Sequence, residues 1–119
     1  MESKAVNQQL KGLIAELERT ARRRNAPIWR RVAELLGRSK RSRAIVNVAE
    51  LMRNTAEGEK IVVPGKVLGA GTASHGLTIA AFRFSPQAKQ KLEKAGCMCI
   101  SILDVLKENP NGTGIRLLG

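Results

Sequence analysis

The chain has 119 residues, 43% of them hydrophobic, a size that suits one domain with its own core. No apolar run approaches the ~18 residues that a membrane span requires. The opening MESKAVNQQL has no secretory-signal pattern, so we expect a cytoplasmic protein without membrane contact. The 21 Lys and Arg residues outweigh 10 Asp and Glu for a net charge of +11, which favours a polyanionic partner such as nucleic acid.

The positive charge is concentrated in the first third of the chain. Residues 1–43 contain twelve basic and four acidic side chains, whereas residues 44–119 contain nine and six. We therefore predict two parts, a basic helical N-terminal extension over 1–43 and a β/α core domain over 44–119. On this division, removal of residues 1–43 should weaken RNA binding far more than it loosens the core.

Apolar residues recur every three or four positions between Lys4 and Arg24, which predicts a helix. Pro27 suits the first position of a second helix, and Gly37 is expected to end that helix in the left-handed conformation. The segment 38–43 has no apolar period, so it is interpreted as a solvated linker or arm.

From Ala44 onward the pattern changes to short units. AIVNV predicts a strand, AELMRN a short helix, and IVV a strand that ends at Pro64-Gly65, a pair typical of turns. KVLG then leads into the small-residue loop AGTASHG, and LTIAAFRFS predicts a largely buried strand.

The last third alternates helices and strands. Ser85-Pro86 is typical of a helix start, and that helix should stop at Gly96. CMCIS predicts a strand, Ser101 with Asp104 has capping-box spacing ahead of ILDVLKEN, and IRLL predicts a final strand. The expected fold class is α/β, a compact core of irregularly wound short strands and helices with a partly parallel sheet.

The stretch Arg19 to Arg43 has the strongest signal for a binding function. Ten of its 25 residues are basic, nine of them arginines, and only Glu34 is acidic. Guanidinium groups grip two phosphate oxygens at once and stack on bases, so this composition favours RNA. Arg22, Arg23 and Arg24 are candidate contacts. A membrane-surface helix would need more apolar bulk opposite the charge.

The sequence has one Trp, two Phe and no Tyr, so an aromatic platform for stacking bases is poorly supplied. Recognition should therefore run through phosphates, sugars and RNA shape. The glycine-rich run VPGKVLGAGTASHG fails as a dinucleotide loop because a strand follows it, and as a phosphate loop because Val67 follows Lys66. Its glycines still permit close backbone approach, so Lys66, Gly69, Gly71 and His75 are candidate RNA contacts.

Catalysis and metal binding have no support in the sequence. Cys97 and Cys99 are interpreted as small buried hydrophobes, because a zinc site wants four ligands and the single histidine, His75, is distant in sequence. One histidine with no carboxylate or thiol at a telling spacing gives no triad. We therefore expect no catalytic residue, no metal site and no cofactor.

Several segments together resemble one known family. IWRRVAELL, RAIVNVAEL, EGEKIVVPGKVLGAG, TIAAFRFSPQAKQKLEKAG and NPNGTGIRLL are similar to the archaeal and eukaryotic large-subunit ribosomal protein eighteen-e family, related to bacterial large-subunit protein fifteen. The resemblance begins near Leu10 and implies a non-enzymatic role in holding large-subunit ribosomal RNA. The absence of a long eukaryote-type extension favours an archaeal source. The RNA contacts that the resemblance implies are Trp29, Arg30, Arg31, Arg38, Ser39, Lys40, Arg41, Arg43 and Lys66.

The leading hypothesis is thus a constituent of the large ribosomal subunit that binds and stabilises its RNA, beside neighbouring ribosomal proteins and not as an independent homo-oligomer. The alternative is a free architectural protein acting on DNA or regulatory RNA. Both predict salt-sensitive binding, because both act through phosphates.

Overall fold

The computed structural model describes residues 4–119, with side chains from Val6 onward. The chain forms five α-helices, one 3-10 helix and five strands over this range. Their bounds are α1 Lys4–Arg24, α2 Pro27–Leu36, η1 Lys40–Ser42, β1 Ala44–Asn47, α3 Val48–Arg53, β2 Lys60–Leu68, β3 Thr78–Phe84, α4 Pro86–Lys94, β4 Met98–Ser101, α5 Ile102–Glu108 and β5 Ile115–Leu117.

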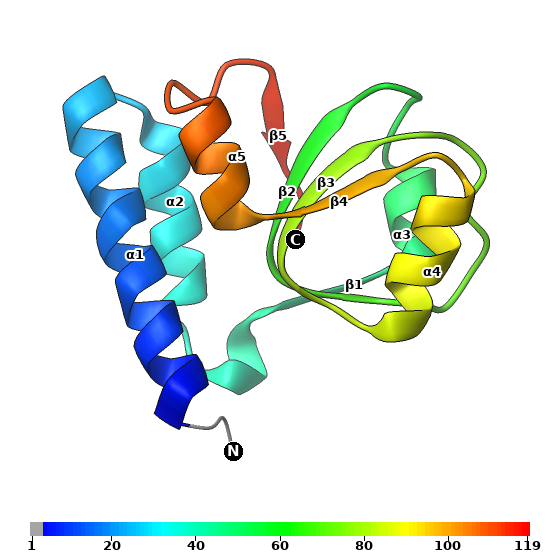
Figure 1. The fold of residues 1–119 in the computed structure, drawn as a ribbon, viewed down its shortest axis with the longest axis horizontal. Helices are drawn as coiled ribbons and strands as arrows, with labels where there is room; N and C mark the ends of the chain where they lie inside the picture. Colours follow the sequence, from blue (N-terminus) through cyan, green and yellow to red (C-terminus); the bar gives the residue numbers. More distant parts are fainter. Residues whose placement is uncertain (1–3) are drawn as a thin grey trace.

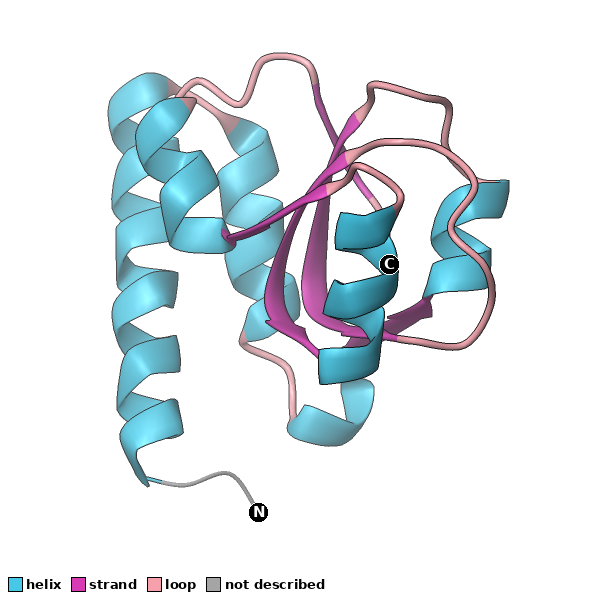
Figure 2. Cartoon of the chain, turned by 45° about the vertical axis from the view of Figure 1, so that its right-hand side comes forward, coloured by secondary structure: helices cyan, strands magenta, loops and turns pink. Residues whose placement is uncertain are grey.

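The elements form three layers, with one sheet between two layers of helices (Figure 1). Helices α1, α2 and α5 cover one face of the sheet, and α3 and α4 cover the other, as the turned view also shows (Figure 2). The strand order is β1-β2-β3-β4, with β5 also paired to β2, and every pairing is parallel. The predicted α/β class is confirmed, and the sheet is parallel throughout rather than in part.

One edge of β2 is shared by two strands that lie end to end. β5 pairs with Lys60–Val62, and β1 pairs with the stretch from Gly65 to Leu68. Pro64 and Gly65 therefore lie inside β2, where the register against β3 shifts, and the prediction of a turn at this pair is wrong. Proline lacks an N–H to donate, which suits the junction between the two partners.

Each face of the sheet has its own hydrophobic core. Val62, Ala80 and residues of α5 pack with the apolar stripe of α1 and α2, including Leu17 and Leu36, both fully buried. The opposite face packs Ile61, Ile79 and others against α3 and α4. The boundary at residues 43 and 44 thus separates regions of different charge, while both regions contribute side chains to the first of these two cores.

Local signals at the helix ends agree with the sequence in most places. Ser85 Oγ accepts from the Ala88 amide at 3.1 Å and Ser101 Oγ from the Asp104 amide at 3.0 Å, as the cap patterns predict. Gly96 has a φ of +87° after α4. Gly37 differs from its prediction: its φ of −73° is ordinary right-handed helix, and its amide bonds to the Ala33 carbonyl.

Gly65 leaves no room for a side chain, because a Cβ there would lie 2.0 Å from the Ala44 carbonyl oxygen. We expect Gly65→Ala to push β1 from β2 and to lower the free energy of unfolding by about 1–3 kcal/mol or more. Gly12→Ala, with nothing within 4 Å of its new Cβ, should instead stabilise α1 by roughly 0.5–1 kcal/mol. Urea unfolding measures the free energy of unfolding of both variants. Equal values would contradict the close approach of β1 to Gly65.

The shared core makes a second prediction about the helical extension. Leu17 is fully buried against the sheet face, so Leu17→Ala should lower the free energy of unfolding by about 2–5 kcal/mol. For the same reason, removing residues 1–43 should unfold the remaining chain, contrary to the expectation from charge alone. A stable, cooperatively folding 44–119 fragment, seen by circular dichroism and thermal melting, would refute the shared core.

Candidate RNA-binding surface

The candidate arginines of the extension lie near the two ends of α2, except Arg30 and Arg31, which lie within that helix. Helices α1 and α2 run antiparallel, so the end of α1 with Arg22–Arg24 lies beside the start of α2 (Figure 1). The segment 38–43 follows the other end of α2 and leads through η1 into β1. A ten-residue helix is about 15 Å long, so the backbone segments that carry the two groups of cations are roughly that far apart.

Carboxylates accompany the cations on the outer face of α1 and α2. Glu16 pairs with Arg19, and Glu34 Oε2 lies 3.1 Å from Arg31 Nη1. Arg22 and Arg30 line a surface hollow of about 450 Å³ together with Glu18 and Glu34. Positive charge on this face is therefore partly balanced within the protein, although such exposed pairs are worth only about 0–1 kcal/mol each and yield readily to phosphate.

The segment 38–43 contains no carboxylate of its own. It includes a turn of 3-10 helix. Ser39 precedes the 3-10 turn η1, in which the Ser42 amide bonds to the Ser39 carbonyl at 2.9 Å. Arg43 Nε donates to the carbonyls of Leu36 and Arg38, at 3.2 Å each, and so caps the C-terminal end of α2. Arg38, Lys40 and Arg41 are exposed to solvent beside this anchored residue.

Lys66 continues the cationic surface onto the sheet. Register places Lys66 between Ile45 of β1 and Arg83 of β3, and side chains in register project from the same face of a sheet. All three are exposed, Ile45 by 58%. Arg83 also lines a surface hollow together with Lys89 of α4. We call Arg38, Lys40, Arg41, Lys66, Arg83 and Lys89 the basic strip.

Sequence reasoning missed Arg83 and Lys89. Both stand outside the arginine-rich stretch that drew attention, and neither belongs to the glycine-rich run. The available signal was Arg83 between Phe82 and Phe84, a cation inside an otherwise apolar strand.

Trp29 differs from its predicted role as an RNA contact. Its side chain is fully buried in the core between α2 and the sheet. Its indole Nε1 donates to the Pro110 carbonyl at 2.9 Å, which ties α2 to the loop before β5. A fully buried ring has no face to offer RNA, so Trp29 is a core residue.

Gly69 and Gly71 lie in a loop that packs against α3 and α4. Lys91 Nζ donates to the carbonyls of Gly69 and Gly71, at 2.6 and 2.8 Å. Gly71 has a φ of +109°, and a Cβ there would lie 2.5 Å from the Cβ of Ala49. A Cβ at Gly69 would lie 2.8 Å from the side chain of Gln87, so packing accounts for both glycines. This loop lies on the opposite side of the sheet from α1 and α2 (Figure 1).

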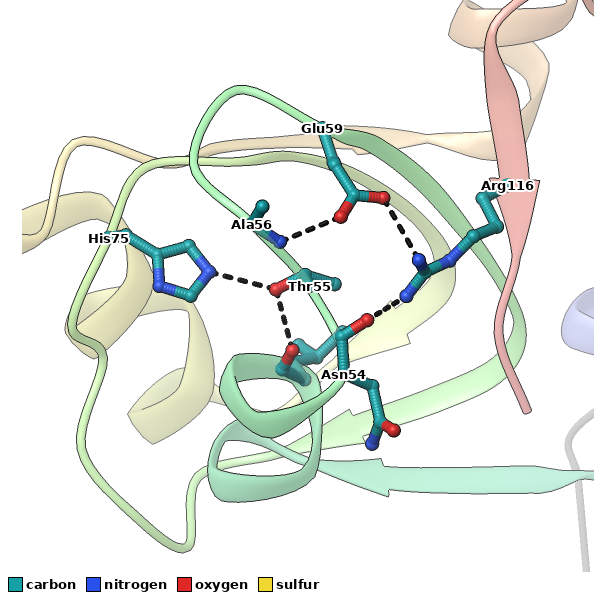
Figure 3. Close-up of polar contacts among 7 residues, drawn as sticks. Asn54, Thr55, Ala56, Glu59, His75 and Arg116 are labelled. Atoms are coloured by element: carbon teal, nitrogen blue, oxygen red, sulfur yellow. Dashed lines mark hydrogen bonds and ion pairs between the residues drawn. The ribbon is translucent and has the colours of Figure 1, made fainter.

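His75 has protein partners at both ring nitrogens, and Figure 3 shows the one at Nε2. The Thr55 hydroxyl donates to the Leu51 carbonyl at 2.7 Å, so it accepts from His75 Nε2 at 2.9 Å. His75 Nδ1 is then the acceptor toward Ser74 Oγ at 3.2 Å, an assignment from the hydrogen-bond network. His75 thus joins its loop to the end of α3.

The same end of α3 is tied to β5. Arg116 Nη1 lies 3.2 Å from Glu59 Oε2, and its guanidinium also donates to the Asn54 carbonyl (Figure 3). Glu59 Oε1 accepts from the Ala56 amide at 2.7 Å. These contacts hold the turn before β2 in place, so the network of Figure 3 is structural.

The two cysteines are free thiols, Cys97 buried and Cys99 only partly buried. Burial raises the pKa of Cys97, and burial together with the charge of Glu93 raises the pKa of Cys99 to about 11. Thiols with raised pKa values are poor nucleophiles and poor metal ligands at neutral pH. Within residues 4–119, no group of His, Cys, Asp and Glu gathers with the geometry of a metal site. Across the same residues, every helix is too short or too polar to cross a membrane.

Comparison with known proteins identifies the family. The family model described as ribosomal protein 60S L18 and 50S L18e matches residues 1–119. The chain belongs to this family, which confirms the resemblance. Among its relatives, the large ribosomal subunit protein eL18 of Methanopyrus kandleri is 45% identical over 117 residues, covering 94% of this chain and 92% of the relative.

Two more relatives have similar coverage and the same name. The eL18 protein of Archaeoglobus fulgidus is 41% identical over 112 residues, which is 94% of this chain and 96% of the relative. That of Pyrobaculum aerophilum is 39% identical, over 94% and 92%. These relatives are archaeal proteins of the large ribosomal subunit, and the similarity extends along nearly the whole chain.

Burial of Trp29 generates a prediction that separates folding from binding. Trp29→Phe removes the donor to the Pro110 carbonyl, so the free energy of unfolding should fall by about 1–3 kcal/mol. Affinity for RNA, measured by filter binding well below the melting temperature, should stay unchanged. Weaker RNA binding at an unchanged free energy of unfolding would instead show that Trp29 contacts RNA.

Proposed function

We propose that this protein is a structural, non-catalytic constituent of the large ribosomal subunit in the cytoplasm, where it binds and stabilises large-subunit ribosomal RNA. Membership of the eL18 family supports the ribosomal role. Its partners are then large-subunit RNA and adjacent ribosomal proteins. The basic surface supplies the RNA contacts.

The observation that carries the proposal is the basic strip. It brings together six cations from the segment around η1, β2, β3 and α4, and no carboxylate pairs with them among the contacts of residues 4–119. Charge without a partner inside the protein is available to phosphates, and binding releases the counterions condensed on RNA. Arg22–Arg24 and Arg30 form a second group of candidate contacts at the other end of α2.

A firm scaffold supports this strip. The apolar face of α1 and α2 is buried against the sheet, and Arg43 fixes the end of α2 to the segment that follows. Cations held at set distances match a fixed arrangement of phosphates with little loss of backbone entropy. The strip therefore suits a folded RNA whose helices approach one another at a defined spacing.

The triple variant Arg38→Gln, Lys40→Gln, Arg41→Gln tests the strip. These side chains are exposed, so the fold should be retained while affinity for large-subunit ribosomal RNA falls. The slope of log affinity against log salt should become shallower by about 0.7–0.9 for each phosphate that the variant no longer neutralises. Filter binding across a salt series measures both effects.

The matched control is Arg53→Gln, Lys94→Gln, Lys107→Gln, which removes the same charge from exposed positions on α3, α4 and α5. Equal reductions in the two triples would mean that only net charge matters, and the strip would be rejected. Sedimentation separates the ribosomal role from a free architectural one: the ribosomal protein should co-migrate with large subunits through a high-salt gradient, while a free binder should remain at the top.

A further inference from the structure

The end of β3 borders a hollow with the composition of a nucleotide site. Pairing with β4 stops at Ala81 and Ser101, so Phe82–Phe84 have a strand on the β2 side alone among the described residues. A shallow hollow of about 300 Å³ lies at this place. Its lining consists of Ala81, Phe82, Arg83, Phe84, Lys89, Cys99, Ile100 and Ser101.

Three properties of this lining distinguish it from an ordinary surface depression. Both phenylalanines of the chain border it and are only half-buried, Phe82 packing against the core on the α1 and α2 side of the sheet and Phe84 against the core on the α3 and α4 side. It has two cations, Arg83 and Lys89, and no carboxylate. Backbone groups of β3 at this edge have no neighbouring strand to bond to within residues 4–119, so they remain available to a ligand's polar edge.

The side chain of Arg83 lies against that of its neighbour Phe82. Its guanidinium carbon lies 5.5 Å from the centroid of the Phe82 ring, a cation–π arrangement. A guanidinium held over a ring is a stacking surface for a base as well as a partner for phosphate. Lys89 of α4 supplies a second charge to the lining.

We propose that this hollow receives one unpaired nucleotide of RNA, with its base against Phe84 and its phosphate between Lys89 and the Arg83 guanidinium that lies over the Phe82 ring. The inference rests on the proposed RNA-binding function and adds a site for a single-stranded residue to the phosphate contacts of the basic strip. An apolar protein segment fits less well, because its backbone and side chains carry no charge to meet two unpaired cations.

The test uses the full chain and an RNA of about 20 nucleotides of mixed sequence with one central 4-thiouridine, single-stranded or annealed to its complement. Irradiation of the single-stranded probe should yield adducts on Phe82, Phe84 or their immediate neighbours, located by mass spectrometry. The annealed probe should yield far fewer, because a paired base cannot enter the hollow.

Two variants each remove one proposed RNA contact and should leave the fold intact. Phe84→Leu removes a stacking surface and should weaken binding of the single-stranded probe by about 5- to 100-fold, while Lys89→Gln removes a phosphate contact and should weaken it by less. Lys94→Gln is the matched control, since it removes the same charge from the same helix at a different hollow. Thermal melts confirm that the variants are folded.

Three results would overturn the proposal. One is binding of the probe without adducts on β3, which would leave the phosphate-binding function intact. Another is an equal effect of Lys89→Gln and Lys94→Gln. The third is a crosslink in native large subunits that joins Lys89 to a lysine of another protein with no uridine adduct nearby, which would assign the hollow to a protein partner. A chain that binds no RNA at all would overturn the proposed function as well.

Discussion

Burial of one apolar face of α1 and α2 against the parallel sheet holds the two differently charged regions of the molecule together. Leu17, Trp29 and Leu36 are fully buried in that interface, where they meet Val62 of β2 and residues of α5. The free energy gained by covering these side chains holds two helices that carry six arginines in a fixed orientation. Without it, the surplus charge of the extension would favour an extended chain.

The same packing decides which cations the protein balances for itself. On the outer face of α1 and α2, Glu16, Glu18 and Glu34 lie among the arginines. Past the end of α2 the chain turns back toward the sheet, and the six cations of the basic strip have no carboxylate partner among residues 4–119. The cationic surface is therefore assembled from segments distant in sequence, and the arginine-rich stretch supplies only part of it.

Much of the secondary structure could be predicted because its signals are local. The apolar stripe predicts α1, Pro27 marks the start of α2, and Ser85 and Ser101 cap α4 and α5 as their spacing indicates. The turn predicted at Pro64-Gly65 is wrong because strand pairing overrides the local preference of this pair for a turn. At that point β2 changes partner along one edge, from β5 to β1. Long-range pairing leaves no trace in a window of a few residues.

The side-chain roles were harder to predict for the same reason. Trp29 and His75 look like binding residues in sequence, but their partners, Pro110 and Thr55, are 81 and 20 residues away. Arg43 belongs to a charge run, yet its Nε caps a helix. Arg83 and Lys89 could not be grouped with Lys66 before the strand register was known.

Hydrogen exchange along α1 and α2 of the free, full-length protein decides whether the sheet or the RNA orders these helices. If the sheet orders them, the backbone amides of both helices exchange far more slowly than those of an unstructured peptide before any RNA is present. Addition of large-subunit ribosomal RNA should then slow exchange mainly around η1 and the ends of β2 and β3. Amides of α1 and α2 that exchange freely until RNA is added would show the opposite, namely that the polyanion and not the sheet holds the helices in place.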